Sequence, residues 1–194
     1  MDDPMLELQE RLKRLLAAAV DGSEETCWHE AIAAVAACIS RTFQVTEGEV
    51  AILLKTSDGQ GLRFVHPPAL AAGANVFPLQ VWSFAGQVTK TGVASLNNAF
   101  TEMKHLSVYE HIKADGPKAG PIHKILAAPL KSEGGIFGVV EVSRKGTTQA
   151  EAGPNFTPTD LTALGGILDR ISPFLRRLRP KRPWHPKPAG RIQE

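Results

Sequence analysis

The chain has 194 residues, of which 43% are hydrophobic and 22% are charged, and its formal net charge at pH 7 is +2. These values are typical of one globular domain with short extensions. Every apolar run is shorter than the ~20 residues that span a bilayer, which excludes a transmembrane helix. The acidic N-terminal sequence MDDPMLELQE is unlike a secretory signal, so we expect a cytoplasmic protein.

Helical patterns cover the first forty residues. Segment 1–22 holds an amphipathic helix over residues 4–20, and its leucine stripe is expected to pack against the last helix or against a second copy of the chain. A second helix, capped by Ser23, carries Cys27 and Cys38. Eleven positions in a helix separate the two cysteines by roughly 16 Å, which is too far for a disulfide. We therefore expect two buried free thiols.

Two strand candidates follow, at residues 49–56 and 62–66, and the turn residues between them predict an antiparallel pair. Residues 69–76 are expected to form a weakly structured connector. A short extended piece is predicted at 77–79.

A short helix is predicted over residues 84–90, with Ser83 as its cap and Gly92 at its end. A strand over 93–96 follows. The next segment, 97–120, is long and polar, with room for one helix at 101–113. A connection of this length inside a compact domain is usually a functional lid or a mobile loop.

The stretch 121–145 is the strongest strand signal in the chain. Two apolar, partly β-branched runs flank a polar linker, which predicts an antiparallel hairpin. The nearly continuous apolar character, interrupted by Gly138 and Glu141, indicates strands covered on both faces in the middle of a sheet. Gly138 is expected to leave room for a helix or a ligand to come close.

The sequence Thr157-Pro158-Thr159-Asp160 predicts the start of a long C-terminal helix. Gly165 and Gly166 interrupt this helix at a cost of roughly 1 kcal/mol each relative to alanine. Their presence indicates a close crossing with a neighbouring element or, alternatively, a signalling hinge. Pro173 is expected to bend or end the helix.

Basic residues gather at the C-terminal end. Residues 176–194 hold seven Lys or Arg and one Glu, a net charge of +6, so the other 175 residues sum to −4. The same segment holds four prolines. This composition predicts a disordered basic tail over 179–194. Contact with nucleic acid or an anionic membrane is one interpretation of the tail, and a solvated extension is the other.

The order of these elements resembles the GAF domain, a sensory module of bacterial kinases, cyclases, phosphodiesterases and transcription regulators. Three pieces carry the resemblance: SFAGQVTKTGVASLNN, ILAAPLKSEGGIFGVVEVSRK and FTPTDLTALGGILDRI. It covers roughly residues 24–175 and implies a sensory domain over 23–178. The implied fold is α+β, with the terminal helices on one face of a central antiparallel sheet. A short helix and a long lid loop on the other face would form a small-molecule pocket.

Some ligands of the family are disfavoured by particular residues. Cyclic-nucleotide-binding members carry Asn-Lys and then Phe, three residues and Asp-Glu. Here Arg144-Lys145 stand at the first pair and Leu161 replaces the Glu, although Phe156 and Asp160 match. Bilin-binding members and free-methionine-sulfoxide reductases use cysteines in or near the lid, where this chain has none.

The candidate ligand-binding residues are aromatic side chains and histidines in or near the lid: Trp82, Phe84, Phe100, His105, Tyr109, His111 and His123. Aromatic rings can stack on a planar ligand, and the alternative is that they are core side chains. No cofactor is required. If a haem is bound, His105, His111 or His123 is the axial ligand, because imidazole binds iron well. The alternative for these histidines is a surface or hydrogen-bonded role.

We therefore expect a non-catalytic sensory or regulatory module that binds a small-molecule effector. It would signal through its terminal helices, residues 5–20 and 160–178, to a homodimer partner or a separate output protein. A ligand-free scaffold protein is the first alternative, and a haem-binding gas or redox sensor is the second. An enzyme is disfavoured because no nucleophile, base and orienting residue stand in a recognisable pattern.

Overall fold

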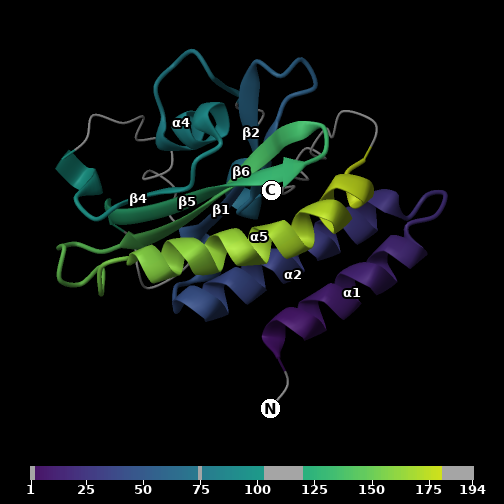
Figure 1. The fold of residues 1–194 in the computed structure, drawn as a ribbon, viewed down its shortest axis with the longest axis horizontal. Helices are drawn as coiled ribbons and strands as arrows, with labels where there is room; N and C mark the ends of the chain where they lie inside the picture. The colour runs from purple at the N-terminus through teal and green to yellow at the C-terminus, as the bar shows by residue number, and fades with distance from the viewer. Residues whose placement is uncertain (1–2, 74–75, 103–119, 181–194) are drawn as a thin grey trace, which may run out of the picture.

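The computed structural model describes residues 3–73, 76–102 and 120–180 (Figure 1). Within these ranges the helices are α1 Pro4–Ala18, α2 Glu24–Phe43, α3 Pro68–Ala71, α4 Phe84–Thr91 and α5 Pro158–Leu178, with short 3-10 turns η1 Glu47–Glu49 and η2 Phe100–Glu102. The strands are β1 Val50–Lys55, β2 Gly61–His66, β3 Val76–Pro78, β4 Ser95–Asn97, β5 Ile122–Ser132 and β6 Gly135–Lys145. None of the helices in the described ranges has the length and apolar character needed to cross a membrane.

The six strands form one antiparallel sheet in the order β3-β2-β1-β6-β5-β4. The predicted hairpin is confirmed as β5 and β6, which pair with each other, with β4 on one side and with β1 on the other. At Gly138 an added Cβ would lie 2.5 Å from the Leu53 carbonyl oxygen and 2.9 Å from Leu54 Cδ2. The nearest atoms therefore belong to strands β1 and β5, and the approach of a helix or a ligand at this glycine stays a prediction.

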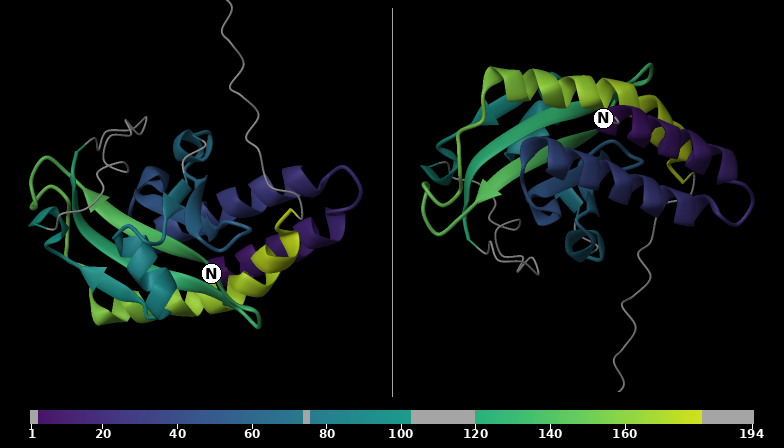
Figure 2. Two further views of the ribbon diagram at one scale, coloured as in Figure 1. Left: turned by 90° about the horizontal axis from the view of Figure 1, so that it is seen from above. Right: turned by 90° about the horizontal axis from the view of Figure 1, so that it is seen from below.

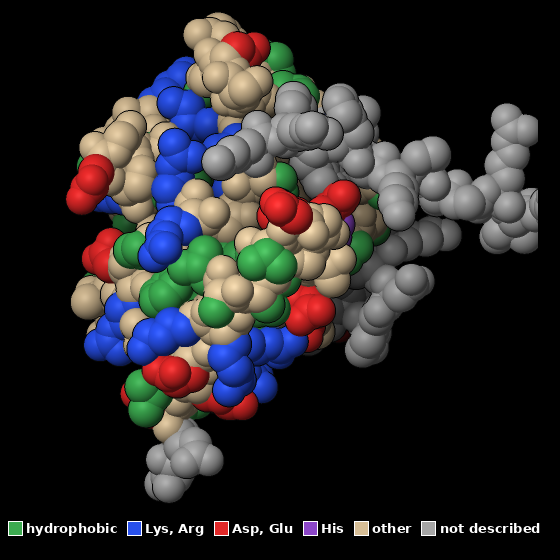
Figure 3. All heavy atoms as spheres, turned by 90° about the vertical axis from the view of Figure 1, so that its right-hand side faces the viewer, with side chains coloured by type: hydrophobic (Ala, Val, Ile, Leu, Met, Phe, Trp, Pro, Cys, Tyr) green, Lys and Arg blue, Asp and Glu red, His purple; other side chains and the backbone are tan. Residues whose placement is uncertain are grey.

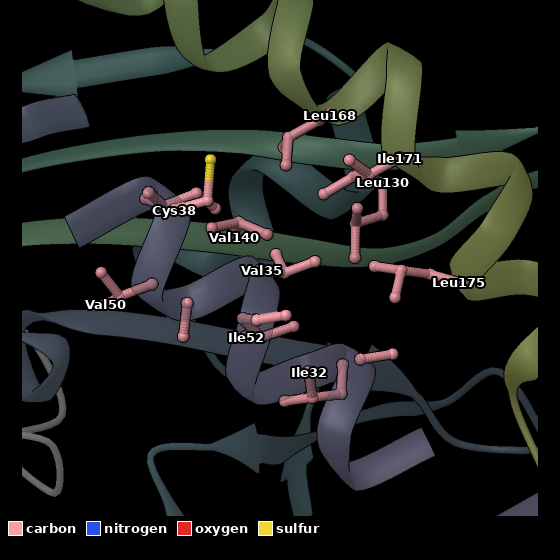
Figure 4. Close-up of a cluster of buried hydrophobic side chains, with 14 of the residues drawn as sticks. Ile32, Val35, Cys38, Val50, Ile52, Leu130, Val140, Leu168, Ile171 and Leu175 are labelled. Carbon is pink, nitrogen blue, oxygen red and sulfur yellow. The ribbon is translucent and has the colours of Figure 1, made fainter. Parts of the chain in front are cut away.

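One face of the sheet is covered by the terminal helices, as predicted. Helices α2 and α5 pack on the strands and on each other, and α1 packs against both helices (Figures 1 and 2). Aliphatic side chains from both layers interlock in the large core between them (Figure 4). Leu8 and Leu12 of α1 are buried in this core, so the leucine stripe packs within its own chain.

The second helix carries both cysteines, and both are buried free thiols, as predicted. Burial raises the pKa of the Cys38 thiol. Both side chains belong to the core on the α2 and α5 side of the sheet.

Helix α5 begins at the predicted start. Thr157 and Asp160 cap each other: the Asp160 carboxylate accepts the Thr157 N–H at 2.7 Å, and the Thr157 hydroxyl accepts the Asp160 N–H at 3.2 Å. The helix runs through Pro173 to Leu178, so it does not end at the proline, and a bend there stays a prediction. Leu175 and Leu178 are buried in the core, which holds the last turns in place.

Three further predictions need correction. A Cβ added to Gly165 or Gly166 would meet nothing within 4 Å, so the close crossing predicted at this pair is wrong within the described chain. The connector predicted over 69–76 contains helix α3, because Pro68 stands at its first position and Leu70 is buried. The strand predicted at 93–96 is formed by Ser95–Asn97 instead.

Candidate functional site

The second face of the sheet, here called the α4 face, lies opposite the terminal helices (Figure 1). A separate buried cluster covers it, with side chains from four strands, α3, α4 and η2: Ala51, Leu53, Leu62, Phe64, Leu70, Phe84, Ala85, Val88, Phe100, Ile122, Ile125, Ala127 and Val139. The predicted arrangement of a short helix on this face is thus confirmed. The lid residues 103–119 lie outside the described residues.

Helix α4 is positioned by its two ends. The Ser83 hydroxyl accepts the Gly86 N–H at 3.0 Å, and a Cβ at residue 86 would lie 2.8 Å from that hydroxyl oxygen. At the other end, Gly92 has a φ of +69° and donates its N–H to the Val88 carbonyl at 2.9 Å. Phe84 and Val88, one turn apart, are both buried in the α4-face cluster, and the helix packs on β5 and β6.

Under the first turn of α4 lies Glu141, in the middle of β6. Its neighbours across the sheet are Ala51 on β1 and Ala127 on β5, and its side chain is 6% exposed. Burial raises the pKa of the Glu141 carboxyl to about 7, although the Ala85 N–H, which donates to the carboxyl, opposes the shift. In the sequence, Glu141 stands out only as a polar interruption of the apolar run in the hairpin.

Further along β6 from Glu141, the polar groups of Ser143 and Lys145 form hydrogen bonds with η1. The Ser143 hydroxyl donates to the Glu49 carbonyl at 3.1 Å, and the Glu49 carboxylate accepts the Lys145 N–H at 2.8 Å. The Lys145 ammonium lies 3.4 Å from the Gly48 carbonyl oxygen. These contacts tie η1 to the end of β6.

The predicted aromatic residues divide into two groups. Phe84 and Phe100 are both buried and meet edge to face with their ring centroids 5.8 Å apart. Their contact supports the core-packing alternative for these two rings. Trp82, just before α4, is 42% exposed. Contact of any of the three with a ligand stays a prediction.

Of the four other predicted site residues, the structure describes only His123. His105, Tyr109 and His111 lie outside the described residues. His123 stands on β5, half-buried, with Nε2 3.1 Å from the Gly146 carbonyl oxygen, so the matching tautomer donates from Nε2. Within the ranges that the structure covers, no group of three His, Cys, Asp or Glu could hold a metal ion. A haem ligand stays a prediction.

The positions compared with the cyclic-nucleotide signature take structural roles on the helix side of the sheet. Arg144 donates from Nη2 to the Phe43 carbonyl at 3.1 Å, and its guanidinium lies 4.7 Å from the centroid of the Phe156 ring. Phe156 is buried in the large core, and Asp160 caps α5. Packing and capping thus account for these residues.

Sequence reasoning also missed a contact between the edge of the sheet and the start of the last helix. Asn98, one residue after β4, donates from Nδ2 to the Phe156 carbonyl at 2.9 Å, and its Oδ1 accepts the Phe156 N–H at 2.9 Å. Phe156 stands two residues before the start of α5. The Asn98 side chain therefore holds the end of edge strand β4 against the entrance of the terminal helix.

No family model matches the chain, and no curated protein matches it either. Solved structures do. A methyl-accepting chemotaxis protein, residues 122 to 287, is similar over 88% of this chain and 96% of that one, with a TM-score of 0.63 and 16% identity. The GAF domain of an Acinetobacter phosphoenolpyruvate-protein phosphotransferase covers 91% of this chain and 95% of its own, with a TM-score of 0.60 and 13% identity. This chain has a GAF-like fold.

An enzyme shares the same GAF-like fold. The free methionine-R-sulfoxide reductase from Neisseria meningitidis, solved in complex with its substrate, is similar over 92% of this chain and 93% of its own. Its TM-score is 0.55 and its identity 16%. At such identities the comparisons establish the fold alone.

Proposed function

We propose that this chain is a non-catalytic sensory or regulatory module. A small-molecule effector binds at the α4 face, and the bound state is passed to the terminal helices. The observation that carries the proposal is the pair of hydrogen bonds between Asn98 and Phe156, which joins the end of edge strand β4 to the entrance of α5, two residues before Phe100 enters the α4-face cluster. A change in the segment that follows β4 would therefore act directly on the helix.

Binding is favoured over thiol catalysis by the position of the cysteines. The sequence has two cysteines, and both lie on α2, across the sheet from α4. The α4 face and the segment 103–119 therefore have no cysteine to act as a nucleophile. We therefore infer that the similarity to a sulfoxide reductase is one of fold and does not extend to thiol catalysis.

A melting screen against small metabolites tests the proposal, since a ligand at 100 times its Kd stabilises the folded state by about 2.7 kcal/mol. Any compound that raises the melting temperature is then examined by hydrogen exchange. The proposal expects slower exchange in α4, β4 and β5, followed by slower exchange in the first turn of α5. In an Asn98→Ala variant the compound should still protect α4 while its effect on α5 falls. A compound that protects only α1 and α2 would contradict the proposal, and a screen without any stabilising compound would favour the scaffold alternative.

The proposed output is a homodimer partner or a separate protein that reads residues 5–20 and 160–178. Because Leu8 and Leu12 are buried within their own chain, the outward face of α5 around Gly166 is the better candidate for contact. Sedimentation of the wild type and of a Gly166→Arg variant tests this choice, with Glu133→Arg in the exposed β5–β6 turn as the control. Loss of the dimer only in the Gly166 variant is expected. An equal dimer in all three chains would refute it.

The basic tail is a separate matter. Arg176 and Arg177 are exposed in the last turn of α5. On the side of the molecule seen in Figure 3, Lys and Arg side chains lie in several groups, with hydrophobic and acidic side chains between some of them. Contact with nucleic acid or an anionic membrane therefore stays a prediction from the sequence of residues 179–194.

A further inference from the structure

Glu141 occupies an unusual place for a carboxyl group. It lies on β6, which has a strand on each side, and the opposite residues Ala51 and Ala127 are small. Helix α4 covers it from above, and the Ala85 N–H in the first turn of that helix donates to its carboxyl. One side chain thus connects the centre of the sheet to the start of the helix that roofs the α4 face.

No cationic side chain near Glu141 in the described ranges neutralises it. On α4 the one charged residue is Lys90, which is exposed, and on β1 it is Lys55, at the far end of the strand. The β5 segment 125–130 has no titratable side chain. Further along β6, Lys145 is held at the Gly48 carbonyl, and its own N–H is bonded to Glu49. Among the described residues, an ionised Glu141 would therefore depend on the Ala85 N–H and the N-terminal end of the α4 dipole.

The free-energy cost of burying Glu141 beneath α4 differs between its two protonation states. A neutral carboxyl is tolerated among alanines and beneath a helix turn, with one N–H donated to it. A carboxylate in the same place has lost its hydration, which is costly when no cation replaces the water. The strands on either side are fixed by ladder hydrogen bonds, so water can return most easily if the first turn of α4 moves away.

We propose that Glu141 is a proton-operated latch that holds the first turn of α4 on the sheet when its carboxyl is neutral and releases it when the proton leaves to solvent. This latch belongs to the fold itself and requires no effector. It makes the roof of the α4 face easier to open on the alkaline side of neutrality. The proposed sensory function can therefore fail without affecting the latch.

The expected size of the effect follows from the pKa values in the two states. With a pKa of about 7 when α4 is closed and about 4.5 when the carboxyl is hydrated, the opening equilibrium should rise about tenfold between pH 6 and pH 8. The direction follows because the raised pKa means that the closed state binds the proton more tightly. Below about pH 4.5 the opening should no longer depend on pH.

Hydrogen exchange of the α4 amides tests the latch, with rates corrected for the intrinsic pH dependence of exchange. In the wild type, protection of residues 86–91 should fall about tenfold from pH 6 to pH 8, while β5 and β6 stay protected. The Glu141→Gln variant keeps a side-chain carbonyl as acceptor and cannot ionise, so its α4 protection should not change with pH. Glu133→Gln, in the exposed β5–β6 turn, is the matched control and should behave as the wild type.

Two results would overturn the latch. One is α4 protection that is flat over this pH range in the wild type, or that falls equally in Glu141→Gln. The other comes from the unmodified protein, so it does not depend on the variant folding: a carboxyl ¹³C titration that places the Glu141 pKa below 5.

Discussion

The glycines of β6 and α5 offer a sharp test of the packing, because the same substitution should have opposite effects at two sites. At Gly166, on α5, an added Cβ meets nothing within 4 Å, and the residue is exposed. Alanine loses less backbone entropy than glycine when a helix forms and is favoured there by about 1 kcal/mol. The Gly166→Ala variant should therefore be more stable by about 1 kcal/mol, which for a chain of this length is about 2–4 °C in Tm. Gly165→Ala should behave in the same way.

At Gly138 the same methyl group should destabilise. Its position would lie 2.5 Å from a backbone oxygen of β1 and 2.9 Å and 3.2 Å from the side chains of Leu54 and Leu130. The backbone oxygen belongs to a paired strand and cannot yield without disturbing the β1–β6 ladder, so a cost of about 1–3 kcal/mol is expected. Urea unfolding followed by circular dichroism, at constant m-value, measures both effects.

The outcome that refutes this reasoning is specific. Both glycine variants are compared at dilute protein concentration, where the chain is monomeric. If Gly166→Ala lowers the stability of the monomer, the open surface around the glycine pair is wrong. A loss of stability that appears only at higher protein concentration instead indicates the partner contact proposed for this face of α5. If Gly138→Ala is neutral, the close approach of β1 is wrong.

Three further variants probe buried polar groups. Glu141→Gln should raise the free energy of unfolding by roughly 3 kcal/mol above pH 7 and leave it unchanged below about pH 4. The reason is that the raised pKa of Glu141 stabilises the wild type only while the carboxyl is protonated, and this contribution is lost as the pH rises from 4.5 through 7. Denaturant unfolding at several pH values tests the sign. Asn98→Ala should cost about 1–3 kcal/mol, since it leaves the N–H and carbonyl of Phe156 without their partner, and faster exchange at the start of α5 should accompany the loss. Ser172→Ala should leave the free energy of unfolding unchanged or raise it by up to about 1 kcal/mol. The Ser172 hydroxyl is buried and has no hydrogen-bond partner in the part of the chain that the structure describes. A clear loss of stability in this variant would show that a hydrogen bond to this hydroxyl exists.

The sequence predicted the elements whose signals are local. The cap formed by Thr157 and Asp160 depends on residues three apart, and the start of α5 could be read directly from that spacing. The β5–β6 hairpin was predictable because two long apolar runs flank one polar turn. Pro173 shows where local signals fail: propensity disfavours a helix there, but burial of Leu175 beyond it outweighs the loss of one backbone bond.

The surroundings of Glu141, on which the proposed latch rests, depend on how the strands are aligned with each other. No local sequence pattern contains that alignment. Glu141 becomes a buried, isolated carboxyl only because Ala51 and Ala127 stand opposite it and Ala85 lies above it. Each of these residues is unremarkable in the sequence. A polar residue inside an otherwise apolar central strand was the available signal, and it indicated burial without saying against what. Of the predicted ligand residues, Phe84 and Phe100 were correctly located near α4, and their mutual contact accounts for their burial.

The alternation of side chains along β6 bears on how the proposed signal would pass between the two faces of the sheet. Along β6, side chains alternate, so Val140 and Val142 belong to the core beneath α2 and α5, while Glu141 between them lies beneath α4. In the proposed latch α4 moves and β6 keeps its ladder bonds, so Glu141 affects the terminal helices only where the strand also shifts and moves the two valines. Asn98 provides a second route at the edge of the sheet, through the hydrogen bonds to Phe156. The two routes differ in what they respond to: the first follows the proton on Glu141, and the second follows the segment after β4. A signal that survives Glu141→Gln and disappears in Asn98→Ala therefore travels along the edge of the sheet, and the reverse pattern places it in the centre.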